Sequence, residues 1–106
     1  MKRIIEVENY LDMEGNPAGG FARDTGMDIV WQNGPLGRGE DRVPPNGAFV
    51  ESVIQAAIKR LEFYQNSKFK CRENAIALTH LETALLWLNK RTQDREQRLV
   101  EGTHNI

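Results

Sequence analysis

The chain has 106 residues and a formal net charge of −1, which is the size of one modest domain and excludes a globally basic nucleic-acid binder. The charge is uneven, because residues 1–50 carry a net of −3 (eight acids, five bases) and residues 51–106 a net of +2 (seven acids, nine bases). A locally basic half on a nearly neutral chain favours a small anionic ligand over a long polyanion such as DNA or RNA.

The N-terminal half predicts short strands joined by turns. Residues 2–7 are rich in β-branched side chains and predict one strand, and residues 28–33 predict a second with Ile29 and Trp31 on one face. Residues 8–27 are polar and contain the turn signals Gly15-Asn16-Pro17 and Gly19-Gly20. Residues 34–47 hold four glycines and three prolines, so we expect a long ordered loop or a small β-like lobe, and loops of this length often carry function.

The C-terminal half predicts a helical hairpin. Apolar residues recur at helical spacing from residue 48, after Asn46 as a plausible N-cap, and predict a helix over 48–65. A connection at 66–70 leads to a second helix over 71–99, whose end Gly102 marks. The apolar stripe of this helix is spaced three and four residues apart and consists of Leu78, Leu81, Leu85 and Leu88. Two helices joined by so short a connection fold back as an antiparallel hairpin.

These elements predict an α+β fold in a single domain over residues 1–106, with a β-rich lobe at 1–47 and an antiparallel two-helix hairpin at 48–106. The second predicted helix exceeds the first by about ten residues, or about 15 Å. It also carries apolar residues outside its main stripe, namely Ala75, Ala77, Ala84, Leu86 and Trp87. A helix that is apolar on two faces needs two neighbours, so we expect a homo-oligomer.

Sequence motifs for catalysis, metals and membranes are missing. His80 and His104 stand in no metal-binding or catalytic-triad pattern, and there is no Walker loop or Gly-x-Ser-x-Gly element. Glu40 and Asp41 are adjacent in a loop, where two carboxylates seldom converge on one substrate. Cys71 is the single cysteine, which excludes an intrachain disulfide and a thiolate zinc cluster. Because no segment approaches the length of an apolar membrane span, we expect a soluble, non-catalytic protein without a metal, a cofactor or membrane contact.

Arginines cluster near the end of the second predicted helix. Arg91, Arg95 and Arg98 are spaced four and three apart, so they share one helix face. The planar guanidinium suits bidentate contact with phosphate. The alternative interpretation is a solvated face that is paired with Asp94 and Glu96.

Aromatic and cationic residues alternate around the predicted bend, at Tyr64, Lys68, Phe69, Lys70 and Arg72. Aromatics beside cations can stack a base and hold its phosphate. The alternative is that the aromatics only close the core of the hairpin. Trp31 and Trp87 are more typical of core residues than of ligand platforms.

The residues from Arg72 to His104 carry a specific pattern. The segments are Cys71-Arg72-Glu73-Asn74-Ala75, His80-Leu81-Glu82, Ala84-Leu85, Trp87-Leu88, Arg91, Asp94-Arg95 and Glu101-Gly102-Thr103-His104. This pattern resembles the C-terminal half of the first Thoeris anti-defence family, which are phage-encoded sponges for immune signals. Trp31-Gln32-Asn33-Gly34-Pro35 and Asn46-Gly47 are similar to that family's N-terminal lobe, so the resemblance covers about residues 28–104. The hairpin is also similar to that of phage anti-CBASS sponges.

The resemblance implies a protein that binds glycocyclic ADP-ribose (gcADPR), the signal of bacterial Thoeris TIR proteins, and sequesters it uncleaved in the cytoplasm of the infected host. It also implies dimers, and hexamers built as trimers of dimers. The family holds its signal with an aromatic before the bend, the asparagine that opens the long helix and two distal arginines. These positions correspond here to Tyr64, Asn74, Arg91 and Arg95.

A second kind of pocket, for cyclic di- or trinucleotides of CBASS systems, lies between protomers in some members of the family. We place it near Lys59, Arg60 and Thr92. Residues 1–27 match the family less clearly, and no ligand contact is assigned to them.

The spacing along the second predicted helix tests the gcADPR assignment. Asn74 and Arg95 are 21 positions apart, about 30 Å along one helix, which is about three times the span of such a ligand. If both residues hold one signal, the site combines two protomers with antiparallel long helices. Three alternatives remain: a sponge selective for cyclic oligonucleotides, an enzyme that degrades the signal, and a structural or protein-binding phage module without a small ligand.

Overall fold

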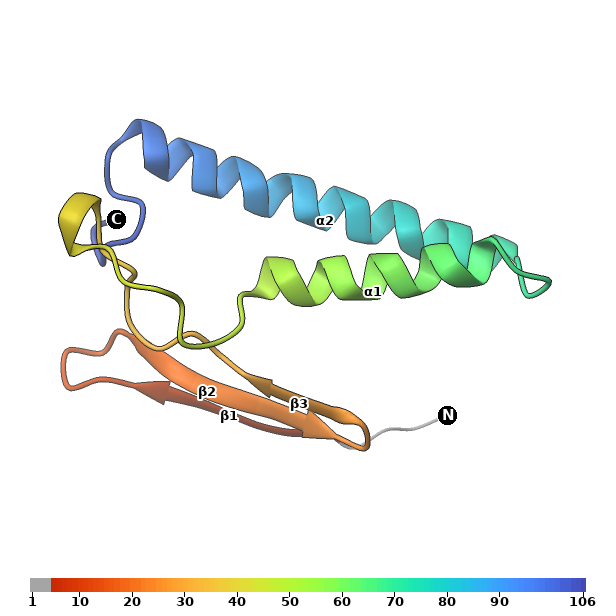
Figure 1. Ribbon diagram of the computed structural model, residues 1–106, viewed down its shortest axis with the longest axis horizontal. Coiled ribbons are helices and arrows are strands. Elements are labelled where there is room, and N and C mark those ends of the chain that lie inside the picture. The colour runs from red at the N-terminus through yellow and green to blue at the C-terminus, as the bar shows by residue number, and fades with distance from the viewer. Residues whose placement is uncertain (1–4) are drawn as a thin grey trace. The chain divides into compact units, whose positions relative to one another are not determined.

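The computed structural model describes residues 5–106, so residues 2–4 of the first predicted strand lie outside the described residues. The chain forms two compact units, one of residues 1–49 together with 100–106 and one of residues 50–99. The first unit holds a β-sheet and the second a helical hairpin (Figure 1). The predicted α+β fold class, strands first and a two-helix hairpin afterwards, is confirmed.

The sheet consists of three antiparallel strands in the order β1-β2-β3. They are β1 (Glu6–Leu11), β2 (Pro17–Asp24) and β3 (Met27–Val30). Val7 pairs with Ala22, which pairs with Ile29, and Ala22 is buried to 7% exposure. The neighbouring row is charged and consists of Glu6, Arg23 and Asp28. Because side chains alternate across a strand, the apolar row and the charged row lie on opposite faces of the sheet.

The central strand β2 was not predicted, because Gly19-Gly20 was interpreted as a turn. Both glycines instead lie inside β2 with positive φ values of 85° and 141°. A Cβ atom on Gly20 would collide with the backbone oxygen of Glu8 on β1. Glycine is therefore needed here for a close approach between two strands rather than for a reversal of the chain.

The reversal between β1 and β2 is made by the turn at residues 12–16. The Asp12 carboxylate accepts hydrogen bonds from the backbone N–H groups of Glu14 and Asn16, each at 2.9 Å. The hydrogen bond from the Asn16 backbone N–H is the main cause of a lowered pKa of Asp12. Such a side-chain turn favours Asp at its first position.

Asn46 does not cap the first helix, in contrast to the prediction, because the helix α1 begins at Val50. The Asn46 side chain instead forms two hydrogen bonds with the Asn33 backbone. It accepts one from the N–H at 2.8 Å and donates the other to the carbonyl at 2.9 Å. The Asn46 N–H donates to the Gln32 side chain at 2.8 Å. The loop at 34–45 is thus closed at its base by an amide pair 13 residues apart.

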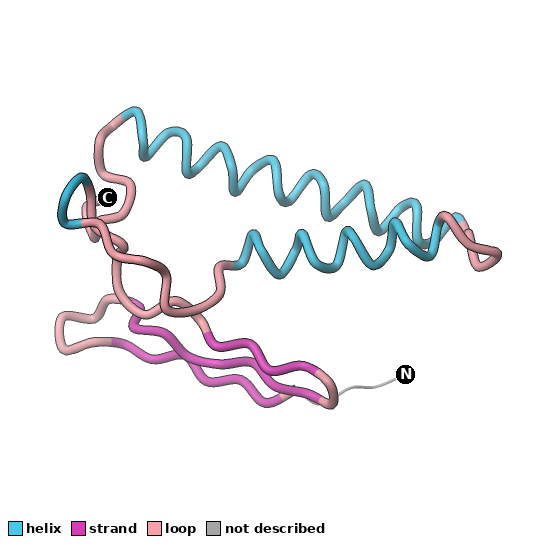
Figure 2. The backbone as a smooth tube through the Cα atoms, in the orientation of Figure 1, coloured by secondary structure: helices cyan, strands magenta, loops and turns pink. Residues whose placement is uncertain are grey.

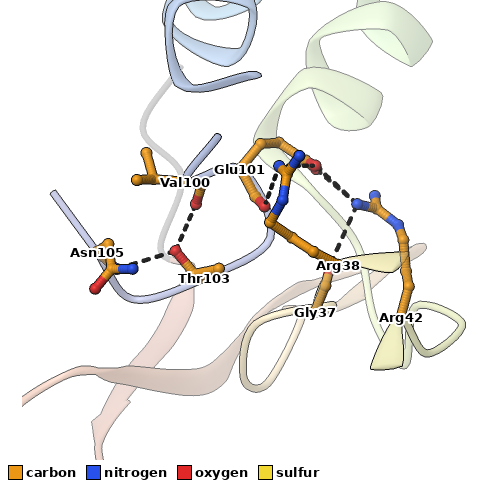
Figure 3. Close-up of polar contacts among 7 residues, drawn as sticks. All are labelled: Gly37, Arg38, Arg42, Val100, Glu101, Thr103 and Asn105. Atoms are coloured by element: carbon orange, nitrogen blue, oxygen red, sulfur yellow. Dashed lines mark hydrogen bonds and ion pairs between the residues drawn. The ribbon is translucent and has the colours of Figure 1, made fainter. Parts of the chain in front are cut away.

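The C-terminal residues return to this loop (Figure 3). The Glu101 carboxylate binds Arg42 Nη1 at 2.8 and 3.1 Å, and the Glu101 carbonyl accepts from Arg38 at 3.1 Å. The Gly37 N–H donates to the Gly102 carbonyl at 2.7 Å. We call residues 36–43 and 100–105, joined by these bonds, the C-terminal clasp.

Gly102 belongs to this clasp and does not end the second helix as predicted. The helix α2 ends at Gln97, and Leu99 adopts a positive φ of 60° two residues later. Gly102 has φ 78°, and a Cβ atom there would collide with the Gly37 carbonyl oxygen. A glycine is required at position 102 because two loops approach each other closely there. No local sequence pattern reveals this requirement.

The second unit is the hairpin of α1 (Val50–Gln65) and α2 (Arg72–Gln97) (Figure 2). The helices were predicted at 48–65 and 71–99, so their bounds differ from the observed ones by at most two residues. The Gln65 side chain closes the bend by accepting from the Cys71 N–H and donating to its carbonyl, each at 3.0 Å.

The hairpin seam follows the predicted leucine stripe. Leu78, Leu81, Leu85 and Leu88 are all half-buried, and Ile58 of α1 is buried to 7% exposure. Neither helix of residues 5–106 is long and apolar enough to cross a membrane.

Candidate functional site

The hairpin bend brings together two of the predicted ligand contacts. Tyr64 lies in the last turn of α1 and Asn74 in the first turn of α2, and both are half-buried. Helix α2 begins after Cys71, which adopts an extended conformation without a side-chain cap. The first-turn asparagine therefore lies close to backbone N–H groups that have no partner within the helix, a favourable surrounding for an anion.

Tyr64 belongs to a cluster on one face of α1 with Arg60 and Phe63. The Arg60 guanidinium carbon lies 4.9 Å from the Tyr64 ring centroid and 5.1 Å from that of Phe63. Arg60 Nε donates to the Tyr64 hydroxyl at 3.2 Å. The two rings meet edge to face with centroids 6.0 Å apart. We call these three residues the Arg60 cluster.

The predicted distal arginines, Arg91 and Arg95, lie in the C-terminal turns of α2, at the end far from the bend. Arg91 is exposed and its Nη2 lies 3.7 Å from Glu51 Oε1 at the start of α1, while Arg95 is half-buried. Asp94 pairs with Lys90 at 2.9 Å. Arg98 is the C-cap residue of α2, and its backbone N–H donates to the Asp94 carbonyl at 3.1 Å.

The four predicted gcADPR contacts thus form two groups within one chain. Asn74 and Arg95 both lie on the continuous helix α2, 21 residues and about 32 Å apart at 1.5 Å per residue. Tyr64 joins Asn74 at the bend, whereas Arg91 joins Arg95 at the distal end. One ligand of nucleotide size cannot bridge both groups on a single chain.

The residues of the second predicted pocket are also separated. Arg91 pairs with Glu51, so Thr92 lies near the start of α1. Arg60 is nine residues further along α1, about 14 Å from Glu51. Lys59 pairs with Glu62 at 3.6 Å. One chain does not bring Lys59 and Arg60 together with Thr92.

Two residues around the predicted site were missed. Glu51 contacts Arg91 across the hairpin, and only the register of the two helices reveals this. Phe63 belongs to the Arg60 cluster, and the spacing of Arg60, Phe63 and Tyr64 by three and four residues was a signal that could have identified it.

Trp87 is not a core residue within one chain, in contrast to the interpretation from its type, because 67% of it is exposed. Leu86 beside it is 70% exposed. A shallow hollow of about 260 Å³ follows this part of α2, lined by Glu82, Leu85, Leu86 and Asn89. Leu86 and Trp87 therefore present exposed apolar side chains between the bend and the distal arginines.

The site has the chemistry of binding. Aromatic rings and a guanidinium at the bend can stack a base, and the distal arginines can contact phosphates. Among residues 5–106 no group of three or more His, Cys, Asp or Glu side chains could hold a metal ion.

The titratable residues singled out in the sequence lie apart from the hairpin bend along the chain. His104 Nδ1 lies 3.4 Å from the Asn16 side-chain amide. Glu40 and Asp41 lie in the short helix η1 (Gly39–Asp41).

A small antiparallel sheet followed by an antiparallel pair of helices defines the class of helical-hairpin domains. The family model described as Acb2/Tad1, hairpin domain, matches residues 23–93, which include β3, the loop after it, all of α1 and most of α2. The chain belongs to this family. The resemblance inferred from the sequence pattern is confirmed.

A curated relative is the protein named Thoeris anti-defense 1 from Bacillus phage SBSphiJ7. The two are 63% identical over 59 residues, which is 56% of this chain and 42% of the relative. The matched part of the chain thus spans less than half of the relative's length.

Proposed function

We propose that this protein is a phage anti-defence sponge that binds a cyclic nucleotide immune signal, chiefly gcADPR, and sequesters it without cleaving it in the cytoplasm of the infected host. The observation that carries this proposal is the match of the Acb2/Tad1 hairpin domain to the helical hairpin and its candidate ligand contacts. Tyr64 and Asn74 at the bend and Arg91 at the distal end all fall within the segment matched by the Acb2/Tad1 hairpin domain. Arg95 follows two residues beyond that segment.

The proposed site requires two chains. Antiparallel long helices would bring the bend of one protomer beside the distal arginines of its partner. The pyrophosphate would then contact Arg91 and Arg95 of one chain, and the adenine would lie at Tyr64 and Asn74 of the other. Charge-assisted hydrogen bonds contribute about 1.5–3 kcal/mol each and base stacking about 1–3 kcal/mol.

The burial within one chain supports a homo-oligomer, either a dimer or a hexamer built as a trimer of dimers. Among residues 5–106 only two hydrophobic residues are buried, Ala22 and Ile58. Large apolar residues of the hairpin remain exposed, including Val50, Phe63, Phe69, Leu86 and Trp87. A short chain with so small a core usually gains stability from a partner.

Cyclic di- or trinucleotides are further proposed ligands, at Lys59, Arg60 and Thr92. Because Thr92 lies near the start of α1 and the two cations lie further along it, this pocket would also combine two chains. A sponge selective for such oligonucleotides, a signal-degrading enzyme and a module without a small ligand are the competing functions.

The decisive experiment incubates the purified protein with gcADPR and, in parallel, with cyclic di- and trinucleotides, removes free ligand, and then denatures the protein. We expect mass spectrometry to recover intact gcADPR in stoichiometric amount. Recovery of a linear product would establish an enzyme instead. Retention of only the oligonucleotides would reassign the ligand, and retention of none would contradict a sponge function.

A further inference from the structure

The Arg60 cluster has a geometry that neither helix packing nor a solvated surface requires. Arg60 contacts two rings and one hydroxyl at the same time, although its side chain is exposed. Lys59, the neighbouring cation, instead pairs with Glu62. Two adjacent cations of α1 therefore have different partners, one a carboxylate and the other an aromatic pair.

We propose that Arg60 is a positioning residue for the base of a purine nucleotide ligand: it holds the Tyr64 ring in the orientation in which that ring stacks on the base. This inference rests on the proposed function and deepens it by assigning the specificity of the bend for an aromatic base. It differs from a direct phosphate contact, because Arg60 acts through Tyr64.

The hydrogen bond restricts the Tyr64 ring at its outer end. A phenol on an exposed helix end can adopt several side-chain rotamers, and ordering it on binding costs free energy. The 3.2 Å bond from Arg60 Nε to the hydroxyl and the nearby guanidinium plane select one of them before the ligand arrives. Preorganisation of this kind raises affinity without a new ligand contact.

Phe63 contacts both Arg60 and Tyr64. Its ring lies 5.1 Å from the Arg60 guanidinium and edge to face with the Tyr64 ring. The guanidinium carbon therefore lies within cation–π distance of two rings, and a guanidinium, unlike the ammonium of a lysine, can stack on an aromatic face.

The first test observes the free protein and needs no ligand. Nuclear magnetic resonance compares the ring signals of Tyr64 in the wild type, Arg60→Met and the matched control Lys59→Met, which loses the same charge one residue away. We expect Arg60→Met to shift the Tyr64 ring signals and Lys59→Met to leave them unchanged. Unchanged Tyr64 signals in Arg60→Met would overturn the proposed positioning.

The second test measures gcADPR affinity by calorimetry in a double-mutant cycle. We expect Arg60→Met to weaken binding about tenfold, in the range of cation–π and hydrogen-bond contributions, and Arg60→Lys to restore less than half of this loss. In a Tyr64→Ala background Arg60→Met should have no further effect, because Arg60 acts through the ring.

Equal losses in the two backgrounds, or equal losses for Arg60→Met and Lys59→Met, would identify a direct charge effect and overturn the inference while leaving the sponge function intact. A wild-type protein that binds no cyclic nucleotide would contradict the proposed function and, with it, the role of Arg60 in ligand binding. The ring signals of the free protein would then still report whether Arg60 orients Tyr64.

Discussion

Arg91 and Arg95 lie one turn apart on α2 but differ in their surroundings. Arg91 is exposed and faces the Glu51 carboxylate at 3.7 Å, whereas Arg95 is half-buried. A carboxylate near a guanidinium occupies the place that a ligand phosphate would take. Arg91 is thus expected to exchange its contact with Glu51 for one with the phosphate when the ligand binds.

Removal of both side chains in Arg91→Ala/Arg95→Ala should abolish gcADPR capture in calorimetry and leave the oligomer intact. The reason is the loss of charge-assisted contacts worth about 1.5–3 kcal/mol each. The control Lys90→Ala/Arg98→Ala removes the same charge from the same end of α2 and should retain binding within about threefold. Unchanged affinity of the first variant would contradict the assignment of these arginines.

Glu51→Gln should tighten gcADPR binding about threefold at low salt, because the ligand no longer competes with a carboxylate for Arg91. The difference should shrink in high salt, where exposed charges are screened. Glu62→Gln is the matched control, since it removes the same charge beside Lys59 on α1. Weaker binding in Glu51→Gln would show instead that Glu51 orients Arg91 for the ligand.

At the scale of elements, the C-terminal clasp joins two loops that are remote in sequence. Glu101 is 21% exposed, and it contacts Arg42 at 2.8 Å and Arg38 at 3.9 Å. Figure 3 shows these contacts of Glu101 with Arg38 and Arg42. Together with the bond from Gly37 to Gly102, they hold the loop at 36–43 against residues 100–105. The glycine-rich loop is ordered by these distant partners in addition to its own turns.

Glu101→Gln should therefore loosen this loop locally. We expect the Gly37 amide to exchange its hydrogen about tenfold faster, because partly exposed ion pairs contribute about 1 kcal/mol or less each and two are weakened together. Amides of β2 should be unaffected. Asp28→Asn, which breaks the Arg23–Asp28 pair of the sheet, is the control and should leave Gly37 unchanged; faster exchange in both variants would indicate a general destabilisation.

The elements also differ in how far the sequence predicted them. The helices α1 and α2 were located within two residues because their apolar period is strong and local. Strand β2 was missed because Gly19-Gly20 has the composition of a turn, and its role in a close strand approach depends on β1. Asn46 and Gly102 were assigned to helix ends, whereas each bonds or contacts a loop residue far away in the chain.

At the scale of the whole molecule, large exposed apolar side chains outnumber buried ones among residues 5–106. Leu86 and Trp87 lie next to one another on α2 and are 70% and 67% exposed. Burial of such large side chains typically contributes about 1.5–3 kcal/mol each. This surface, between the bend and the distal arginines, is where a partner helix would complete the proposed site.

Trp87→Glu should dissociate the proposed oligomer, because a carboxylate would be buried in an apolar interface. Sedimentation velocity should report a smaller species, and gcADPR binding should be lost with it. Gln93→Glu, which adds the same charge at an exposed position of α2, should sediment as the wild type does. A monomeric wild type that binds the signal would refute the two-chain site.

The sequence by itself determined the helical hairpin and the family, because helical period and short motifs are local properties of the chain. The aromatic, asparagine and arginine contacts stay predictions. Only the tertiary structure decided that Glu51 meets Arg91, and that Glu101 and Gly102 close the loop at 36–43. These contacts depend on the register of the two helices and on the approach of residues that are remote in sequence. Packing sets both, and no local spacing of residues encodes them.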